Sequence, residues 1–516
     1  MIYDKEFGLT RKEQDTSCEC STEHVLPDYN GDVRKILYSE ANLRPGAKFM
    51  GEDEAEFSGQ VAYKVIYSDI ENKISGTEFY SDYDLGVKLR TRGPENVNCD
   101  TRVTNYAIRL LGPRKFSAKA SVGAQVNTTE KAKLTSNMWE KAKDGEIQTK
   151  ITNIKVRNTT TTESLEREIA ESLGHLDGVT EDELKIIYFS AEPFAEQTSL
   201  ADNNIIIKGK INLKCVIESE GNSAYTLKKA VPFEVEIPFG EFDQDELIFP
   251  LVTVTSERFI INPDETGCEI LANIIFEYSA VIEKNEAVSV VSDAFITSCP
   301  AENTYYDFNY TEICERVSHN TKNNSEAPRG ELCEGAIREI IFINSFPKIE
   351  SAKIVDNAVE VKGEIKYMGV TSEVNDDGSI SYSGLRFTTP FAEKVNINCQ
   401  TSDKTNLNVK ILSEDANADL DAETVYFSSN LVLDVMILEE KTIKGVSECV
   451  GIEKDAYSEE KATVRVYYPD SDEDAFSVAR KFRVSVGGLC EKNSISQEVS
   501  ASDSGSLKLP KKLIIY

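Results

Sequence analysis

The stretch from Asn203 to Ile217 alternates apolar and polar side chains along most of its length. The apolar positions are Ile205, Ile207, Ile211, Leu213 and Cys215, and Lys208, Lys210, Asn212 and Lys214 lie between them. A period of two residues is typical of a strand with one buried face, whereas a helix would repeat every three to four residues. The stretch therefore predicts a β-strand.

This pattern occurs three times, around Gly59, Gly209 and Gly363. The first two glycines are 150 residues apart and the last two are 154 residues apart. Apolar or aromatic side chains follow each glycine two and four positions later. Each copy also has a phenylalanine 20 to 24 residues later, which is Phe79, Phe233 or Phe387. Three copies in the same order predict a triplicated β domain, and the spacing is too long for a solenoid.

The length of 516 residues exceeds what one hydrophobic core usually supports, and it suggests three or four domains. Because the repeats predict no helical layer, the expected fold is mainly β, with three tandem antiparallel, sandwich-like domains and a small βααβ module. The expected segments are an N-terminal arm (1–25), β domain 1 (26–160), β domain 2 with a helical lead-in (161–317), a linker (318–336), β domain 3 (337–458) and a C-terminal module (459–516).

The helical lead-in rests on a possible capping box, Thr160 with Glu163, and on Leu165, Ile169 and Leu173, which lie four residues apart. The linker is polar, with Asn320, Asn323, Asn324 and Pro328, and it is interpreted as a hinge.

Turns and strand pairs were also assigned from local composition. Hairpin turns are predicted at 111–115 and at Asp376-Asp377-Gly378. The apolar stretches 269–282 and 287–297 are predicted to form a pair of strands.

The net charge of -31 limits the kinds of partner that are expected. Such a surface repels phosphate backbones and anionic lipid heads, so neither nucleic acid nor a membrane surface is an expected partner. Cationic protein surfaces are natural partners, or the charge serves solubility alone. The first residues carry charges from Asp4 onward, and no run of side chains has the length of a membrane span. The expected location is the cytoplasm.

Candidate chemistry is sparse. The 11 cysteines are an odd number and are expected to be reduced thiols, and a metal site at Cys18, Cys20 and His24 is disfavoured because no second ligand pair follows. The other histidines, His175 and His319, have no recognisable nucleophile beside them. Carboxylate pairs are expected by accident among 88 acidic residues, and there is no phosphate-binding loop motif. The sequence predicts a protein without catalytic residues, cofactor or metal.

The C-terminal module resembles a LysM domain. The residues that match its helices and last strand are Ser477 to Phe482, Val484 to Val486, Leu489, Asn493, Pro510, Leu513 and Ile515. Asp472, Glu473 and Asp474 replace the Gly-Asp-Thr turn of that family, and Lys511 and Lys512 replace Gly and Gln after the proline. LysM domains hold N-acetylglucosamine with these two loops. Because both loops differ from the family here, the resemblance implies a LysM-like module that binds protein instead of glycan.

The repeats are similar to SPOCS domains, the spore-coat-associated β domains of clostridial proteins. The similarity rests on Leu26-Pro27-Asp28, on Val33 to Leu37, on the strand at Gly59 and on 106–115. Three such domains before a LysM domain resemble the clostridial SipL-type spore morphogenetic proteins. The resemblance implies a mother-cell protein at the forespore surface, whose LysM module docks onto the coat-organising ATPase.

A small basic patch on the acidic chain is the candidate partner-binding surface. It comprises Phe476, Arg480, Lys481, Arg483, Lys511 and Lys512. These residues could equally form a solvated helix face. The leading hypothesis is a non-enzymatic scaffold of the spore coat. The alternatives are a glycan-binding protein that recognises peptidoglycan or chitin-type polymers, and a subunit of a self-assembling filament or shell.

Overall fold

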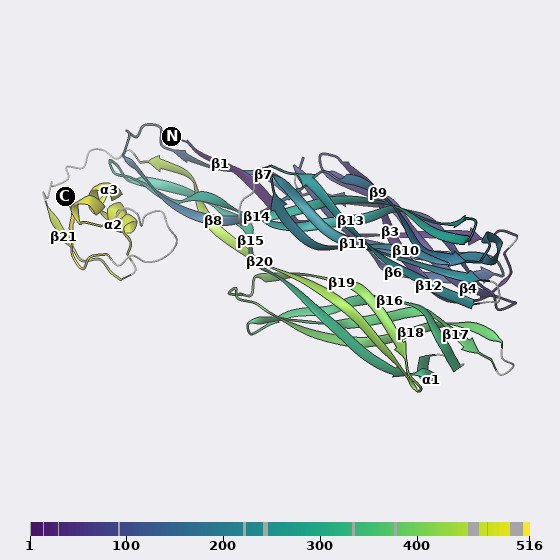
Figure 1. Ribbon diagram of the computed structural model, residues 1–516. Coiled ribbons are helices and arrows are strands. Elements are labelled where there is room, and N and C mark those ends of the chain that lie inside the picture. The colour runs from purple at the N-terminus through teal and green to yellow at the C-terminus, as the bar shows by residue number, and fades with distance from the viewer. Residues whose placement is uncertain are drawn as a thin grey trace.

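The computed structural model describes residues 2–13, 15–28, 30–90, 93–219, 223–240, 246–332, 336–375, 379–452, 464–471, 473–495 and 509–515. Strands make up most of these residues, so the predicted fold class, mainly β, is confirmed. The molecule is elongated, with a small helical module at one end and the broad part of the β structure at the other (Figure 1).

Unit 1 is defined as β1 to β7. Its strands are β1 (Ile2–Lys12), β2 (Thr16–Val25), β3 (Val33–Met50), β4 (Glu54–Asp69), β5 (Ile74–Lys88), β6 (Asn96–Gly112) and β7 (Lys115–Met138). Strands β3, β4 and β5 form one antiparallel sheet, and β2 and β6 flank β7 in a second. The two sheets enclose one apolar core that includes Tyr63, Phe79 and Phe116.

Units 2 and 3 repeat this strand order. Unit 2 comprises β8 (Ile147–Thr161), β9 (Leu165–Asp177), the short η1 (Glu181–Glu183), β10 (Leu184–Ala201), β11 (Asn204–Ser219), β12 (Ser223–Pro238), β13 (Leu247–Pro263) and β14 (Gly267–Ile296). Unit 3 comprises β15 (Ala301–Pro328), α1 (Arg329–Leu332), β16 (Ala336–Val355), β17 (Ala358–Val374), β18 (Ile380–Asn396), β19 (Thr405–Leu420) and β20 (Thr424–Gly451). Their meander sheets are β10-β11-β12 and β16-β17-β18.

The three repeat glycines lie at equivalent positions on the central strands β4, β11 and β17. At each one, an added Cβ would collide with a carbonyl oxygen of the preceding strand, which belongs to Arg44, Phe194 or Lys348. The absence of a side chain therefore allows the close strand contact.

An aromatic ring on the next strand covers each of these glycines. The covering residues are Tyr83, Phe233 and Phe391. The predicted set of three phenylalanines was therefore out of register, because Phe79 and Phe387 lie opposite Tyr63 and Tyr367 instead. The β17–β18 hairpin is four residues longer than the other two, which brought Phe387 to the same distance from its glycine as Phe233.

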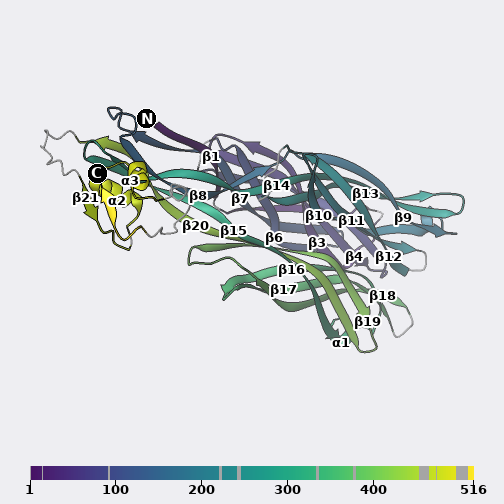
Figure 2. The same cartoon turned by 60° about the vertical axis from the view of Figure 1, so that its left-hand side comes forward.

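Three long strands, β7, β14 and β20, continue beyond their sandwiches. Paired with β1, β8 and β15, they form three antiparallel strand pairs that we call the stalk. Residues Phe7, Ile154, Val288 and Phe308 pack inside it, and a short parallel contact joins β20 to β7. Figure 2 shows the stalk reaching toward the C-terminal module. The N-terminal arm was thus predicted wrongly, since β1 and β2 are core strands.

The helix predicted at the start of domain 2 is also wrong, because Leu165, Ile169 and Leu173 lie on strand β9. A spacing of four residues is a multiple of the strand period as well as close to one helical turn. All three side chains pack against the core of unit 2. Pairing of β9 with β14 decided between the two structures.

The predicted polar linker (318–336) is likewise strand over most of its length. β15 pairs with β20 as far as Pro328, and α1 follows directly. His319 and Thr321 both contact the carboxylate of Glu393. The backbone of this polar stretch is therefore paired in a sheet, and the side chains of His319 and Thr321 have a partner in Glu393. β8, which was assigned to domain 1, pairs with β14 and belongs to unit 2.

The predicted strand pair in 269–297 is one continuous strand, β14. The polar residues that suggested a turn have partners in neighbouring strands: Glu283 pairs with Arg157, and Asn285 exchanges two hydrogen bonds with the backbone of Ile313. The hairpin at 111–115 is confirmed by the antiparallel pairing of β6 and β7. The turn at Asp376-Asp377-Gly378 lies outside the described residues.

The C-terminal module consists of β21 (Arg465–Tyr467), α2 (Ala475–Phe482), α3 (Val486–Lys492) and β22 (Leu513–Ile515). Asp474 caps α2 by accepting from Ser477 N, and Ser485 caps α3 by accepting from Gly488 N. β21 and β22 pair antiparallel. Among the helices of the described residues, none is long and apolar enough to cross a membrane.

Candidate functional site

The three meander sheets meet at a shared centre, which we call the junction. Strands β3, β10 and β16 each contain a bulge at an equivalent residue, Leu37, Ile187 or Ile341. A bulge lets two successive side chains turn to the same side of a strand. Each bulged residue and the next one are therefore both buried in a cluster to which all three units contribute.

The residues after the bulges form an aromatic triangle at the junction. The ring centroids of Tyr38 and Tyr188 are 5.7 Å apart, and Phe342 lies 5.0 Å from each. β5 contacts β10, β12 contacts β16, and β18 contacts β3. Unit 1 therefore contacts unit 2, unit 2 contacts unit 3, and unit 3 contacts unit 1, which closes a pseudo-threefold ring.

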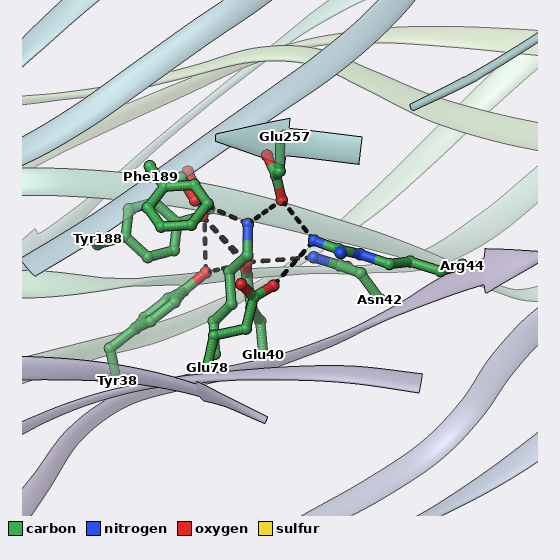
Figure 3. Close-up of polar contacts among 10 residues, drawn as sticks. Tyr38, Glu40, Asn42, Arg44, Glu78, Tyr188, Phe189 and Glu257 are labelled. Atoms are coloured by element: carbon green, nitrogen blue, oxygen red, sulfur yellow. Dashed lines mark hydrogen bonds and ion pairs between the residues drawn. The ribbon is translucent and has the colours of Figure 1, made fainter. Parts of the chain in front are cut away.

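A polar layer lies beside the aromatic triangle. Glu40, Ser190 and Asn344 occupy equivalent positions there, with the same 150- and 154-residue offsets as the glycines, and all three are buried. Tyr38 Oη donates to Glu40 Oε2 at 2.5 Å, and Tyr188 Oη donates to Glu40 Oε1 at 3.1 Å (Figure 3). Asn344 Nδ2 donates to the Tyr38 hydroxyl at 2.9 Å and to that of Tyr188 at 3.1 Å. The side-chain polar atoms of Glu40 and Asn344 thus have hydrogen-bond partners, as buried polar atoms require for stability.

Burial dominates the proton affinities in this layer. It raises the pKa of the Glu40 carboxyl, against the opposing attraction of the Lys64 ammonium. It also raises the pKa values of the Tyr38 and Tyr188 phenols well above their ordinary value, so both remain hydrogen-bond donors.

Lysines of two units reach across to the next unit at equivalent atoms. Lys64 Nζ donates to the carbonyl oxygen of Phe189 at 2.7 Å, and Lys214 Nζ donates to that of Ile343 at 3.2 Å. The third equivalent position holds Met368. Tyr106 Oη supplies the missing donor there, with a hydrogen bond of 2.7 Å to the carbonyl oxygen of Ser39.

The two lysines meet different second partners. Lys64 Nζ lies 2.5 Å from Glu257 Oε1, which also accepts from Arg44 at 3.3 Å, and Arg44 pairs with Glu78 at 3.0 Å (Figure 3). This is a buried ion network between units 1 and 2. Lys214 Nζ instead donates to the side-chain oxygen of Asn344 in unit 3. One junction therefore holds charges, and the next places an amine against a carboxamide.

The junction was not identified from the sequence. The signal was available, because applying the glycine offsets to Lys64 leads to Lys214 and then to Met368, and applying them to Glu40 leads to Ser190 and then to Asn344. What the offsets do not indicate is that these positions face each other across units.

Two of the predicted partner-binding residues on α2 contact the stalk. The rings of Phe476 and Phe295 are 5.1 Å apart and nearly perpendicular, and Arg480 pairs with Asp293 at 2.5 Å. The cap of α2 is attached as well, because Asp474 pairs with Lys150 at 2.6 Å. This helix face therefore joins the module to β8 and β14.

The other four predicted residues lie within the module. Lys481 bonds to the Tyr467 hydroxyl at 2.7 Å and pairs with Glu473 at 3.4 Å, within the module. Arg483 ends α2 in the left-handed conformation, with φ of 52°. Lys511 and Lys512 are exposed just before β22. Phe476 is buried against the stalk, so it is not part of an exposed surface.

An apolar stripe that was not predicted from the sequence lies on the two-stranded sheet of the module. Tyr467 and Leu513 face the interior, so alternation turns their neighbours outward. The outward side chains on β21 and next to it, Val464, Val466 and Tyr468, are 53%, 52% and 67% exposed. Ile514 is paired with Val466, and Lys512 adjoins it, so this outer sheet face combines apolar and basic groups.

The cysteine and histidine side chains that were weighed as metal ligands or catalytic groups make packing contacts, hydrogen bonds and ion pairs with other side chains. Cys20 contacts the Tyr63 hydroxyl, and His24 stacks on Phe79 at 4.7 Å, where burial lowers the pKa of His24. His175 bridges Asp264 and Asp177 at the end of unit 2, at 2.8 and 2.9 Å. Within the described ranges, no group of three or more His, Cys, Asp or Glu residues is placed to hold a metal.

Comparison with protein-family models, with curated proteins and with solved structures found no match to this chain.

Proposed function

We propose that this chain is a non-enzymatic scaffold of spore-coat assembly that anchors coat components at the forespore surface through a LysM-like tail. The resemblance of the repeats to SPOCS domains and of the tail to LysM supports this assignment. In the proposal, units 1 to 3 are the SPOCS-like domains, and the partner of the tail is the coat-organising ATPase in the mother-cell cytoplasm.

The observation that carries the proposal is the exposed stripe of Val464, Val466 and Tyr468 on the tail. Apolar side chains that alternate along a short exposed strand offer both side-chain contacts and a backbone edge to a partner. Because Phe476 and Arg480 hold the tail on the stalk, the proposed docking surface is the outer sheet face rather than α2.

Charge supports a partner surface with carboxylates around an apolar centre. Lys511 and Lys512 adjoin the stripe on a chain whose net charge is -31. Basic groups at the edge of an interface steer association and fix orientation more than they increase affinity. The stripe would therefore supply most of the binding free energy.

The test is localisation of a fluorescently tagged protein in a sporulating host. We expect deletion of 462–516 to abolish recruitment to the forespore, and the double variant Val466→Glu, Tyr468→Glu to do the same while the protein stays folded. The matched control is Leu412→Glu, because Leu412 is 59% exposed on β19, far from the tail in sequence. Normal recruitment of the double variant would overturn the proposed docking surface.

Two alternatives make different predictions. A glycan-binding tail would retain the protein on insoluble peptidoglycan, and chitin fragments would compete it away. A self-assembling subunit would give regular assemblies in electron micrographs of the pure protein. Either result, together with normal recruitment of the double variant, would replace the scaffold proposal.

A further inference from the structure

The contact between units 2 and 3 brings together two groups that can react. Lys214 on β11 carries a primary amine, and Asn344 on β16 carries a carboxamide. Lys214 Nζ donates to Asn344 Oδ1. This oxygen is bonded to the carboxamide carbon, so the amine lies close to the carbon that it would attack. A second hydrogen bond of 3.2 Å, to the carbonyl oxygen of Ile343, holds Nζ in place. Fixed proximity of this kind can replace a large part of an activation barrier.

The carboxamide is held from its other side as well. Asn344 is only 6% exposed, and its Nδ2 donates to the hydroxyls of Tyr38 and Tyr188. Both hydroxyls donate in turn to the carboxylate of Glu40. A chain of hydrogen bonds therefore leads from the nitrogen of the carboxamide to a buried acid.

We propose that Lys214 and Asn344 form an intramolecular isopeptide bond that covalently joins unit 2 to unit 3. The new bond links Lys214 Nζ to Asn344 Cγ, and the bond between Cγ and Nδ2 breaks. The ammonium of lysine and the carboxamide give a secondary amide and one ammonium ion, so atoms and charge balance without an oxidant or cofactor.

The junction supplies what each proton transfer requires. The amine must be neutral to attack, and burial lowers the pKa of Lys214, against the attraction of Glu192, Glu40 and Asp415. Lys228 acts in the same direction as burial. One proton leaves Nζ and one reaches Nδ2 as ammonia departs. Tyr38 and Tyr188 lie on the path from Nδ2 to Glu40, and burial raises the pKa of this carboxyl, so it takes up a proton more readily than an exposed carboxyl would.

The other two junctions lack this pair. Lys64 faces the carboxylate of Glu257, so a bond there would release water and not ammonia. The equivalent residue of unit 3 is Met368, which has no nucleophile. The chain therefore contains its own controls, and the inference concerns one junction of three.

The experiment is intact-mass spectrometry of the purified full chain, followed by peptide mapping. We expect the wild-type mass to be lower than the sequence mass by one ammonia, and a branched peptide to contain Lys214 and Asn344. Lys214→Met, which copies unit 3, and Asn344→Ala should both restore the full sequence mass. Lys208→Met, which removes an exposed amine from the same strand, should retain the loss.

One outcome of this experiment does not depend on whether a variant folds. A wild-type chain at the full sequence mass would overturn the proposal. Ammonia can also be lost by succinimide formation at Asn30, which precedes Gly31. A loss that disappears in Asn30→Ser, or on treatment with hydroxylamine, would likewise refute the cross-link.

Discussion

The junction between units 1 and 2 and the junction between units 3 and 1 share a backbone and differ in chemistry. In the first, Lys64 donates to the carbonyl of Phe189 and is neutralised by Glu257. In the second, Met368 replaces the lysine, and Tyr106 donates to the equivalent carbonyl of Ser39. The position of Tyr106 on β6 matches that of Glu257 on β13, since each lies two residues beyond a bulge in its strand.

This comparison shows which part of the junction is indispensable. A donor to the bulge-flanking carbonyl is present at both junctions, whereas the buried ion pair is present at one. A buried carbonyl without a donor is costly, and a buried charge is tolerated only with a partner. The shared requirement is therefore hydrogen bonding, and the ion network is one of two ways to meet it.

The largest expected effect comes from Lys64→Met. This change leaves Glu257 buried with Arg44 as its remaining cation, and we expect it to lower the free energy of unfolding by about 3–5 kcal/mol. Adding Glu257→Tyr would copy the junction of units 3 and 1, and it should recover more than half of the loss. Urea denaturation of the wild type and both variants measures this. A double variant no more stable than the single one would show that the two junctions are not interchangeable.

A smaller effect is expected from close backbone contacts between units. A Cβ at Gly76 would collide with the carbonyl oxygen of Ile187, whereas the equivalent residue of unit 2, Thr226, donates a hydrogen bond of 2.5 Å to the carbonyl of Ile341. We expect Gly76→Ala to cost about 1–3 kcal/mol by overpacking. Gly112→Ala is the matched control, because an added Cβ meets no atom there. Equal effects of the two changes in urea denaturation would contradict a tight contact at Gly76.

The smallest expected effect is a pH dependence of stability that arises from His175 in unit 2. The hydrogen bond to Asp264, and then that to Asp177, raises the pKa of His175 above its ordinary value of 6.5. The folded state therefore binds this proton more tightly than the unfolded state. The stabilisation is complete below the unfolded pKa and is lost as the pH rises through the folded pKa.

The measurement is the Tm difference between wild type and His175→Asn at about pH 6 and about pH 9. We expect a larger difference at the lower pH. His24→Asn is a control of opposite sign, because burial lowers the pKa of His24 and protonation favours unfolding there. A difference for His175→Asn that does not change with pH would show that its carboxylate contacts do not stabilise unit 2.

Part of the candidate surface on the tail could be predicted from the sequence, and part could not. The two helices and the exposed lysines Lys511 and Lys512 follow from local patterns. That Phe476 and Arg480 contact β14 could not be foreseen, because Phe295 and Asp293 are more than 180 residues away along the chain. An apolar or charged residue on a helix looks the same in sequence whether its partner is another protein or another part of the same chain.

The sequence by itself determined the strand character and the threefold repetition, because alternation of side chains and constant spacing are local properties of the chain. The tertiary structure decided whether the polar runs form turns and hinges or strands. Residues 318–328 and 283–286 suggested a hinge and a turn, yet they lie in strands, because β20, Arg157 and Ile313 supply their hydrogen bonds. The backbone of a polar run can lie in a sheet only when partner groups are present, and here they come from a distant segment.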